Sequence, residues 1–110
     1  MRRLVLLLAL WPSVVAAEEP WRGLTGPEIT TALSERVLQY ADGTRQDFMA
    51  DGRTLYGEES WGSWRVEGDE YCSVWPPSDR WACYSVEIRG LELRFTDGGE
   101  PSVGRYVDLN

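Results

Sequence analysis

The two cysteines of the chain, Cys72 and Cys83, flank a segment that is typical of a tight antiparallel hairpin. Residues 76–79 read Pro-Pro-Ser-Asp, a loop composition, and lie between two short apolar runs. If Trp75 pairs with Arg80, Cys72 falls directly opposite Cys83, at a spacing that allows a disulfide. We therefore predict a Cys72–Cys83 disulfide that fixes the register of two neighbouring strands.

The first seventeen residues have the pattern of a secretory signal peptide. Arg2 and Arg3 precede an apolar run over residues 4–11, and small residues lead to Ala17. The run is too short to span a membrane. We expect residues 1–17 to be removed and residues 18–110 to form one small β domain in the periplasm or outside the cell, where a disulfide persists.

The charge balance narrows the range of partners. The chain has 18 acidic and 11 basic side chains and a net charge of -7, and loss of Arg2 and Arg3 would take the net charge to -9. An acidic surface disfavours nucleic acid and anionic lipid as partners. Basic proteins and small ligands remain possible partners.

A helix-start signal follows the predicted cleavage site. Thr25 can serve as N-cap, Glu28 completes a capping box, and Pro27 suits the first turn. We predict a helix over residues 26–34. Its apolar side, with Ile29 and Leu33, would lie against a sheet or plug one end of it.

From Arg36 onward, apolar and polar residues alternate with a period of two between closely spaced turn signals. Residues 41–43 and 50–52, both Ala-Asp-Gly, suit three-residue hairpin loops. Gly68-Asp69 suits a type II′ turn, and another turn is expected at Arg89-Gly90. These registers place on one inner face Leu38, Tyr40, Gln46, Phe48, Thr54, Tyr56, Trp64, Val66, Tyr71, Ser73, Trp75, Ala82, Tyr84, Val86, Ile88, Leu91, Leu93 and Phe95.

The predicted fold is mainly β: an up-and-down antiparallel meander of about eight strands with one short N-terminal helix. It would form a curled sheet or a small lipocalin-like barrel. A barrel of this size either fills its interior with side chains or holds one small molecule. We expect the many aromatic rings to fill it, with a ligand cavity as the alternative.

Little in the sequence points to catalysis. The chain has no histidine, which removes imidazole bases and histidine metal ligands, and it lacks a G-x-S-x-G elbow. We predict no catalytic residue, metal ligand or cofactor. A hydrolase with a carboxylate pair is the third hypothesis for the function.

The leading hypothesis is a non-enzymatic periplasmic module that binds another protein, with a possible inhibitory effect. Val74 and Trp81 are expected as an outward cross-strand pair beside the disulfide, next to Pro76, Pro77 and Arg80. Exposed aromatic, proline and arginine side chains are typical of binding surfaces. Alternatively, Trp81 only covers the disulfide. The second hypothesis is a carrier of a small apolar ligand inside the barrel.

The motif C-S-x-W-P-P followed by W-x-C-Y, from Cys72 to Tyr84, resembles that of small exported proteobacterial proteins of unknown function. The preceding G-x-W-x-V-x-G-D, from Gly62 to Asp69, fits the same pattern. The resemblance implies no activity. In plan, the chain is also similar to periplasmic lipocalin-like inhibitors of proteases or lysozymes, although its cysteine placement differs from that of the protease inhibitors.

Overall fold

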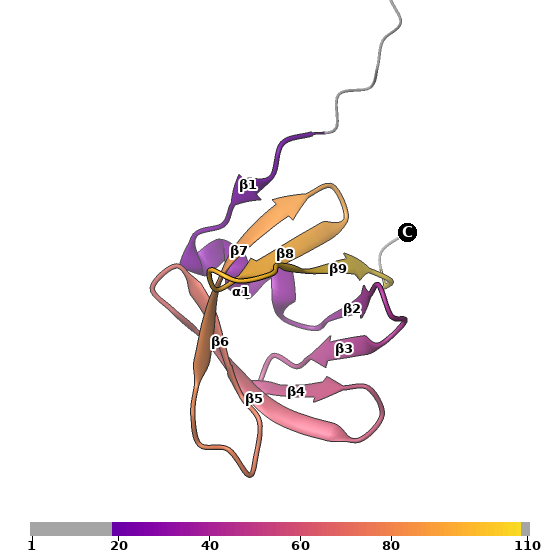
Figure 1. Ribbon diagram of the computed structural model, residues 1–110, viewed down its shortest axis with the longest axis vertical. Helices are drawn as coiled ribbons and strands as arrows, with labels where there is room; N and C mark the ends of the chain where they lie inside the picture. The colour runs from indigo at the N-terminus through magenta and orange to yellow at the C-terminus, as the bar shows by residue number, and fades with distance from the viewer. Residues whose placement is uncertain (1–18, 109–110) are drawn as a thin grey trace, which may run out of the picture.

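The computed structural model describes residues 19–108 (Figure 1). The predicted signal peptide, residues 1–17, lies outside this range. The elements are β1 (Arg22–Gly23), α1 (Gly26–Leu33), β2 (Arg36–Tyr40), β3 (Arg45–Phe48), β4 (Arg53–Tyr56), β5 (Ser60–Glu67), β6 (Glu70–Val74), β7 (Ala82–Arg89), β8 (Glu92–Thr96) and β9 (Ser102–Tyr106).

Strands β2 to β9 form a closed, all-antiparallel, up-and-down barrel of eight strands, as the turn spacing predicts. The ladder runs β7-β6-β5-β4-β3-β2-β9-β8, and β8 pairs with β7 to close it. The short strand β1 extends the sheet along β7, with Arg22 opposite Ile88. Closure leaves each of the eight strands with two neighbours, so the barrel has no long free edge.

Helix α1 begins as predicted and ends one residue earlier than predicted. The Glu28 carboxylate accepts hydrogen bonds from the Thr25 backbone N–H (3.0 Å) and hydroxyl (3.1 Å), which with Arg22 lower the pKa of Glu28 to about 2. Asp69 in the β5–β6 turn accepts a hydrogen bond from the Gly26 N–H at 2.7 Å. Among residues 19–108, no helix has the length and apolar character needed to cross a bilayer.

The registers of the first hairpins are confirmed. Backbone hydrogen bonds from Tyr40 to Thr44 and from Met49 to Arg53 close the two three-residue loops. Glu67 pairs with Glu70, which brings Val66 opposite Tyr71 and Trp64 opposite Ser73. The predicted inner face of β2 to β6 is therefore the face that points into the barrel.

The predicted β7–β8 register is wrong by two residues. Arg89 pairs with Glu92, so the loop residues are Gly90 and Leu91, not Arg89 and Gly90. Gly90 has φ +57°, and a type II′ turn requires this conformation at the first loop position, which glycine accepts without strain. An even shift keeps Leu93 and Phe95 on the inner face, whereas Leu91 is exposed in the turn.

The predicted strand pairing beyond the cysteines is also wrong in part. The β6–β7 ladder ends at Ser73 and Ala82, so Val74 does not pair with Trp81, nor Trp75 with Arg80. Residues 75–81 instead form an open loop that begins with a turn, in which the Ser78 N–H donates to the Trp75 carbonyl at 3.0 Å. Because this turn takes up the Trp75 carbonyl, and the Trp75 side chain points into the barrel, the chain leaves the ladder before Trp75.

The disulfide is confirmed. Cys72 and Cys83 are direct partners in the β6–β7 ladder, and their sulfur atoms are bonded at 2.04 Å. The Cys72 side chain is fully buried.

The hydrophobic core fills the barrel at the end where α1 lies. Ile29 and Leu33 of the helix are fully buried and contact the inward side chains of the barrel. The Tyr106 hydroxyl donates to the Ala32 carbonyl at 2.5 Å and ties the last strand to the helix. The cluster comprises Leu24, Ile29, Leu33, Leu38, Phe48, Trp64, Tyr71, Val86, Leu93, Phe95 and Tyr106.

Loss of the disulfide should destabilise this barrel markedly. Cys72→Ala/Cys83→Ala should lower the free energy of unfolding by about 2–4 kcal/mol, because the unfolded chain regains freedom and the buried sulfur is lost. Urea denaturation of the variant and of the oxidised chain measures the difference. Equal midpoints would show that the bridge contributes nothing to stability.

Candidate aromatic cup

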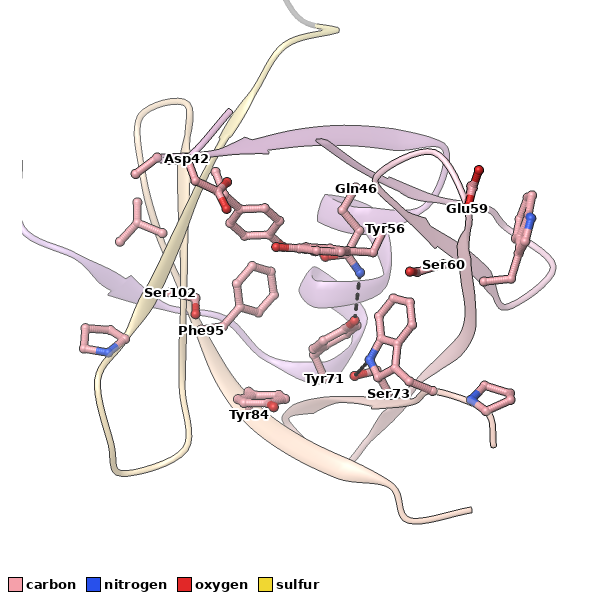
Figure 2. A pocket seen from close by; sticks show the side chains of 17 residues that line it. Asp42, Gln46, Tyr56, Glu59, Ser60, Tyr71, Ser73, Tyr84, Phe95 and Ser102 are labelled. Carbon is pink, nitrogen blue, oxygen red and sulfur yellow. Dashed lines mark hydrogen bonds between the residues drawn. The ribbon is translucent and has the colours of Figure 1, made fainter. Parts of the chain in front are cut away.

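The barrel end opposite α1 is hollow. A cavity of about 1100 Å³ opens there to solvent, and Figure 2 shows the side chains that point into it. Six aromatic rings and two polar side chains form its inner surface, which we call the cup. Its residues are Tyr40, Gln46, Tyr56, Tyr71, Ser73, Trp75, Tyr84 and Phe95.

The exposed fractions of the inward side chains show where the packed core ends and the open cavity begins. Leu38 and Phe48, near the helix, are 0% and 2% exposed, whereas Tyr56, on the same inner face, is 38% exposed. Tyr40 and Trp75 are half-buried. The expectation that rings fill the whole interior is therefore wrong for this end of the barrel, because the helix fills only the other end.

At the floor of the cup, the Gln46 side chain is hydrogen-bonded to the hydroxyl groups around it. Gln46 accepts a hydrogen bond from the Tyr40 hydroxyl (2.6 Å) and donates to the Thr54 hydroxyl (2.9 Å) and the Tyr71 hydroxyl (3.4 Å). Burial raises the pKa of both Tyr40 and Tyr71. The phenols at the floor are therefore neutral at physiological pH, and the polar atoms there are already paired.

The wall is built from rings that meet at an angle. Tyr56 lies 6.0 Å from Tyr40 and 6.1 Å from Trp75 between ring centroids. The Trp75 indole N–H donates to the Ser73 hydroxyl at 3.3 Å. Edge and tilted contacts of this kind stabilise ring pairs and leave ring faces free for another molecule.

Four loops surround the mouth: residues 41–44, 57–59, 75–81 and 97–101. Together they carry six carboxylates and one arginine, Arg80. Among the described residues that line the cavity, the charged ones are Asp42 and Glu59, which lie on opposite sides in Figure 2. A hydrogen bond from the Thr44 backbone N–H lowers the pKa of Asp42. The mouth is therefore negatively charged at neutral pH.

Trp21 and Trp81, which lie outside the cavity, differ from the rings of the cup because each of them has an arginine guanidinium over its ring. Arg65 stacks on Trp81 with its central carbon 3.8 Å from the ring centroid, and Arg89 lies 4.3 Å from that of Trp21. Within residues 19–108, no arginine lies over a ring of the cup. The ring faces of the cup therefore have no cation from the described chain.

The predicted partner-binding residues lie around this same end, on the 75–81 loop and beside it. Pro76 lines the cavity mouth. Pro77 and Arg80 are exposed on the loop, while Val74 and Trp81 are half-buried. All five residues therefore lie at or beside the rim of the cup. The Val74–Trp81 pair that the hairpin pattern predicted does not form.

From the sequence, all eight cup residues were assigned to the inner face, but a ligand cavity was only the alternative to a filled interior and was not placed at one end of the barrel. A partial signal was the Tyr or Trp at the inward position next to three of the mouth loops: Tyr40, Tyr56 and Trp75. Period-two alternation gives the face of a residue but not its depth in the barrel.

One cluster of potential metal ligands lies outside the barrel and has an ordinary explanation. The Glu67 carboxylate is 3.5 Å from the Cys72 sulfur and 3.7 Å from the Cys83 sulfur. Metal binding by cysteine requires thiolates, and both sulfurs are bonded to each other.

Comparisons with known proteins give no relative: no family model, curated protein or solved structure matches the chain. The predicted resemblance to exported proteobacterial proteins gains no support from them. The closed antiparallel barrel with its disulfide stands without an identified family.

The cup depends on a glycine in the neighbouring strand. A Cβ on Gly62 would lie 2.6 Å from the Trp75 ring and 2.7 Å from the Val74 carbonyl oxygen. Gly62→Ala should therefore displace the Trp75 indole and lower the free energy of unfolding by about 1–3 kcal/mol. Urea denaturation and tryptophan fluorescence measure the two effects.

The matched control is Gly23→Ala, because a Cβ on Gly23 meets nothing within 4 Å. If both variants unfold at the same urea concentration with unchanged fluorescence, Gly62 does not set the position of Trp75.

Proposed function

We propose that this protein is a non-enzymatic binding module that holds a small, largely apolar molecule in the cup. The observation that carries the proposal is an open cavity of about 1100 Å³ inside a closed barrel, with the six aromatic rings of the cup on its inner surface. Small-molecule sites are concave, mostly apolar and few in a protein. The disulfide is consistent with action in an oxidising compartment, the periplasm or the extracellular space.

The exposure of the cup rings supports a ligand. Tyr56 leaves 38% of its surface in water although it points into the barrel. Burying this apolar surface would contribute free energy at about 25 cal/mol per Å². The rigid barrel holds the rings in place beforehand, so little conformational freedom is lost on binding.

Catalysis by a carboxylate pair gains no comparable support. Asp42 and Glu59 both line the mouth, but the lowered pKa of Asp42 does not suit it as the general acid of such a pair. A general acid of a glycoside hydrolase needs a raised pKa.

A neutral fluorescent probe, 1-N-phenylnaphthylamine, tests the proposal. We expect saturable binding with one site per chain and a blue-shifted emission. Tyr56→Ala should weaken binding about fivefold, because one ring of the wall is lost. Trp81→Ala serves as the control and should leave binding unchanged, since Trp81 lies outside the cavity. Absence of saturable binding would overturn the proposal.

A second candidate function is contact with another protein through the 75–81 loop and Trp81. The specific observation is the Arg65–Trp81 stack at 3.8 Å beside the disulfide, which presents a rigid aromatic and cationic surface at the rim. Arginine and tryptophan are enriched among residues that dominate binding energy at interfaces.

Trp81→Ala should abolish capture of any protein partner from a periplasmic extract by the immobilised chain, because it removes the ring on which Arg65 stacks. Leu91→Ala, an exposed apolar residue in the β7–β8 turn, is the control and should capture the same partner as the unmodified chain. Mass spectrometry identifies the captured protein. A partner retained equally by both variants would exclude Trp81 from the contact.

A further inference from the structure

If the cup binds a small molecule, as proposed above, its residues also indicate the chemical class of that ligand. Three features of the cup bear on the charge of a bound molecule: ring faces without a cation, a negatively charged mouth, and polar atoms at the floor that are already paired. Each points in the same direction.

The rings provide a surface that attracts cations. Tyr40, Tyr56, Trp75 and Tyr84 form the wall, and the faces of aromatic rings carry partial negative charge. Away from the cavity, Trp21 and Trp81 each lie near an arginine guanidinium, and at the mouth Arg53 lies 5.5 Å from the ring centroid of Trp61, which lines the cavity outside the cup. Within the described chain, the cup rings have no such partner, so a ligand can supply the cation.

The mouth carries negative charge, which attracts a cationic ligand. Asp42 and Glu59 line the cavity, and the four mouth loops carry six carboxylates against one arginine. A cleft with one sign of charge over low-dielectric walls concentrates ligands of the opposite sign. An anionic ligand would be repelled at the mouth and would find no cationic partner among the described lining residues.

The floor discriminates between kinds of cation. The Gln46 carbonyl oxygen already accepts a hydrogen bond from Tyr40, and the Ser73 hydroxyl oxygen accepts one from Trp75. A primary ammonium has three N–H donors that would lose their water partners in the cup. An N-alkylated ammonium has few or none, and its charge is spread over methyl groups that pack on rings.

We propose that the cup binds an organic monocation, a quaternary or otherwise N-alkylated ammonium attached to an apolar body, with its charged group held on the ring faces inside the cup and attracted there by the negative charge of the mouth.

Three probes of similar shape test the proposal on the full mature chain: benzyltrimethylammonium, its neutral carbon isostere neopentylbenzene, and the primary amine benzylammonium. The readout is the two-dimensional NMR spectrum of the tryptophan indole N–H groups. We expect benzyltrimethylammonium to shift the Trp75 indole signal and leave those of Trp21 and Trp81 unchanged. It should bind about tenfold more tightly than the neutral isostere and more tightly than benzylammonium.

Rim variants test the contribution of the carboxylates. Asp42→Asn with Glu59→Gln should weaken binding of the quaternary cation severalfold and leave binding of neopentylbenzene unchanged. Asp51→Asn with Glu70→Gln is the matched control. It makes the same change in net charge at the closed end of the barrel, and Asp51 occupies the equivalent position in the other Ala-Asp-Gly loop. Urea denaturation checks that both pairs of variants fold.

The outcomes separate this inference from the function on which it rests. If neopentylbenzene or benzylammonium binds at Trp75 as tightly as the quaternary cation, the ligand class is wrong and the cup still binds small molecules. If the rim and control variants weaken cation binding equally, the carboxylates of the mouth do not select charge and the proposal fails. If none of the three probes nor 1-N-phenylnaphthylamine shifts the Trp75 signal, both proposals are overturned.

Discussion

The packing of α1 into one end of the barrel is the interaction on which the rest of the structure depends. Ile29 and Leu33 are fully buried there among inward side chains of the strands. Helix α1, of eight residues, covers only this one end of the barrel (Figure 2). The interior is therefore divided into a packed half, which stabilises the fold, and an open half, which can hold a ligand.

This division separates the roles of the aromatic residues. Trp64 and Phe48 are buried in the packed half, with their ring centroids 6.0 Å apart, and contribute to stability. Trp75 and Tyr56 belong to the same alternating pattern but lie beyond the reach of the helix, where their rings face solvent. The same physical property, a large apolar ring on an inward position, thus serves stability at one end and provides a binding surface at the other.

Much of the fold could be predicted because the relevant rules act over a few residues. The type II′ turn at Gly68-Asp69 fixed the β5–β6 register, and the pairing of Cys72 with Cys83 followed from a loop between them. The errors arose where a local rule was applied incompletely. At Gly90 the glycine must occupy the first loop position, and the turn from Trp75 to Ser78 takes the chain out of the ladder before Val74 can pair with Trp81.

The sequence by itself determined the helix start, the disulfide and the face on which each strand residue lies, because capping, turn conformation and period-two alternation depend on near neighbours in the chain. Only the tertiary structure decided that the last strand, β9, pairs with β2 to close the barrel, and that Tyr40, Tyr56, Trp75 and Tyr84 surround one cavity. Closure depends on the curvature and stagger of all eight strands together, and the burial of an inward residue depends on which end of the barrel the helix covers. Neither quantity is encoded in any single stretch of residues.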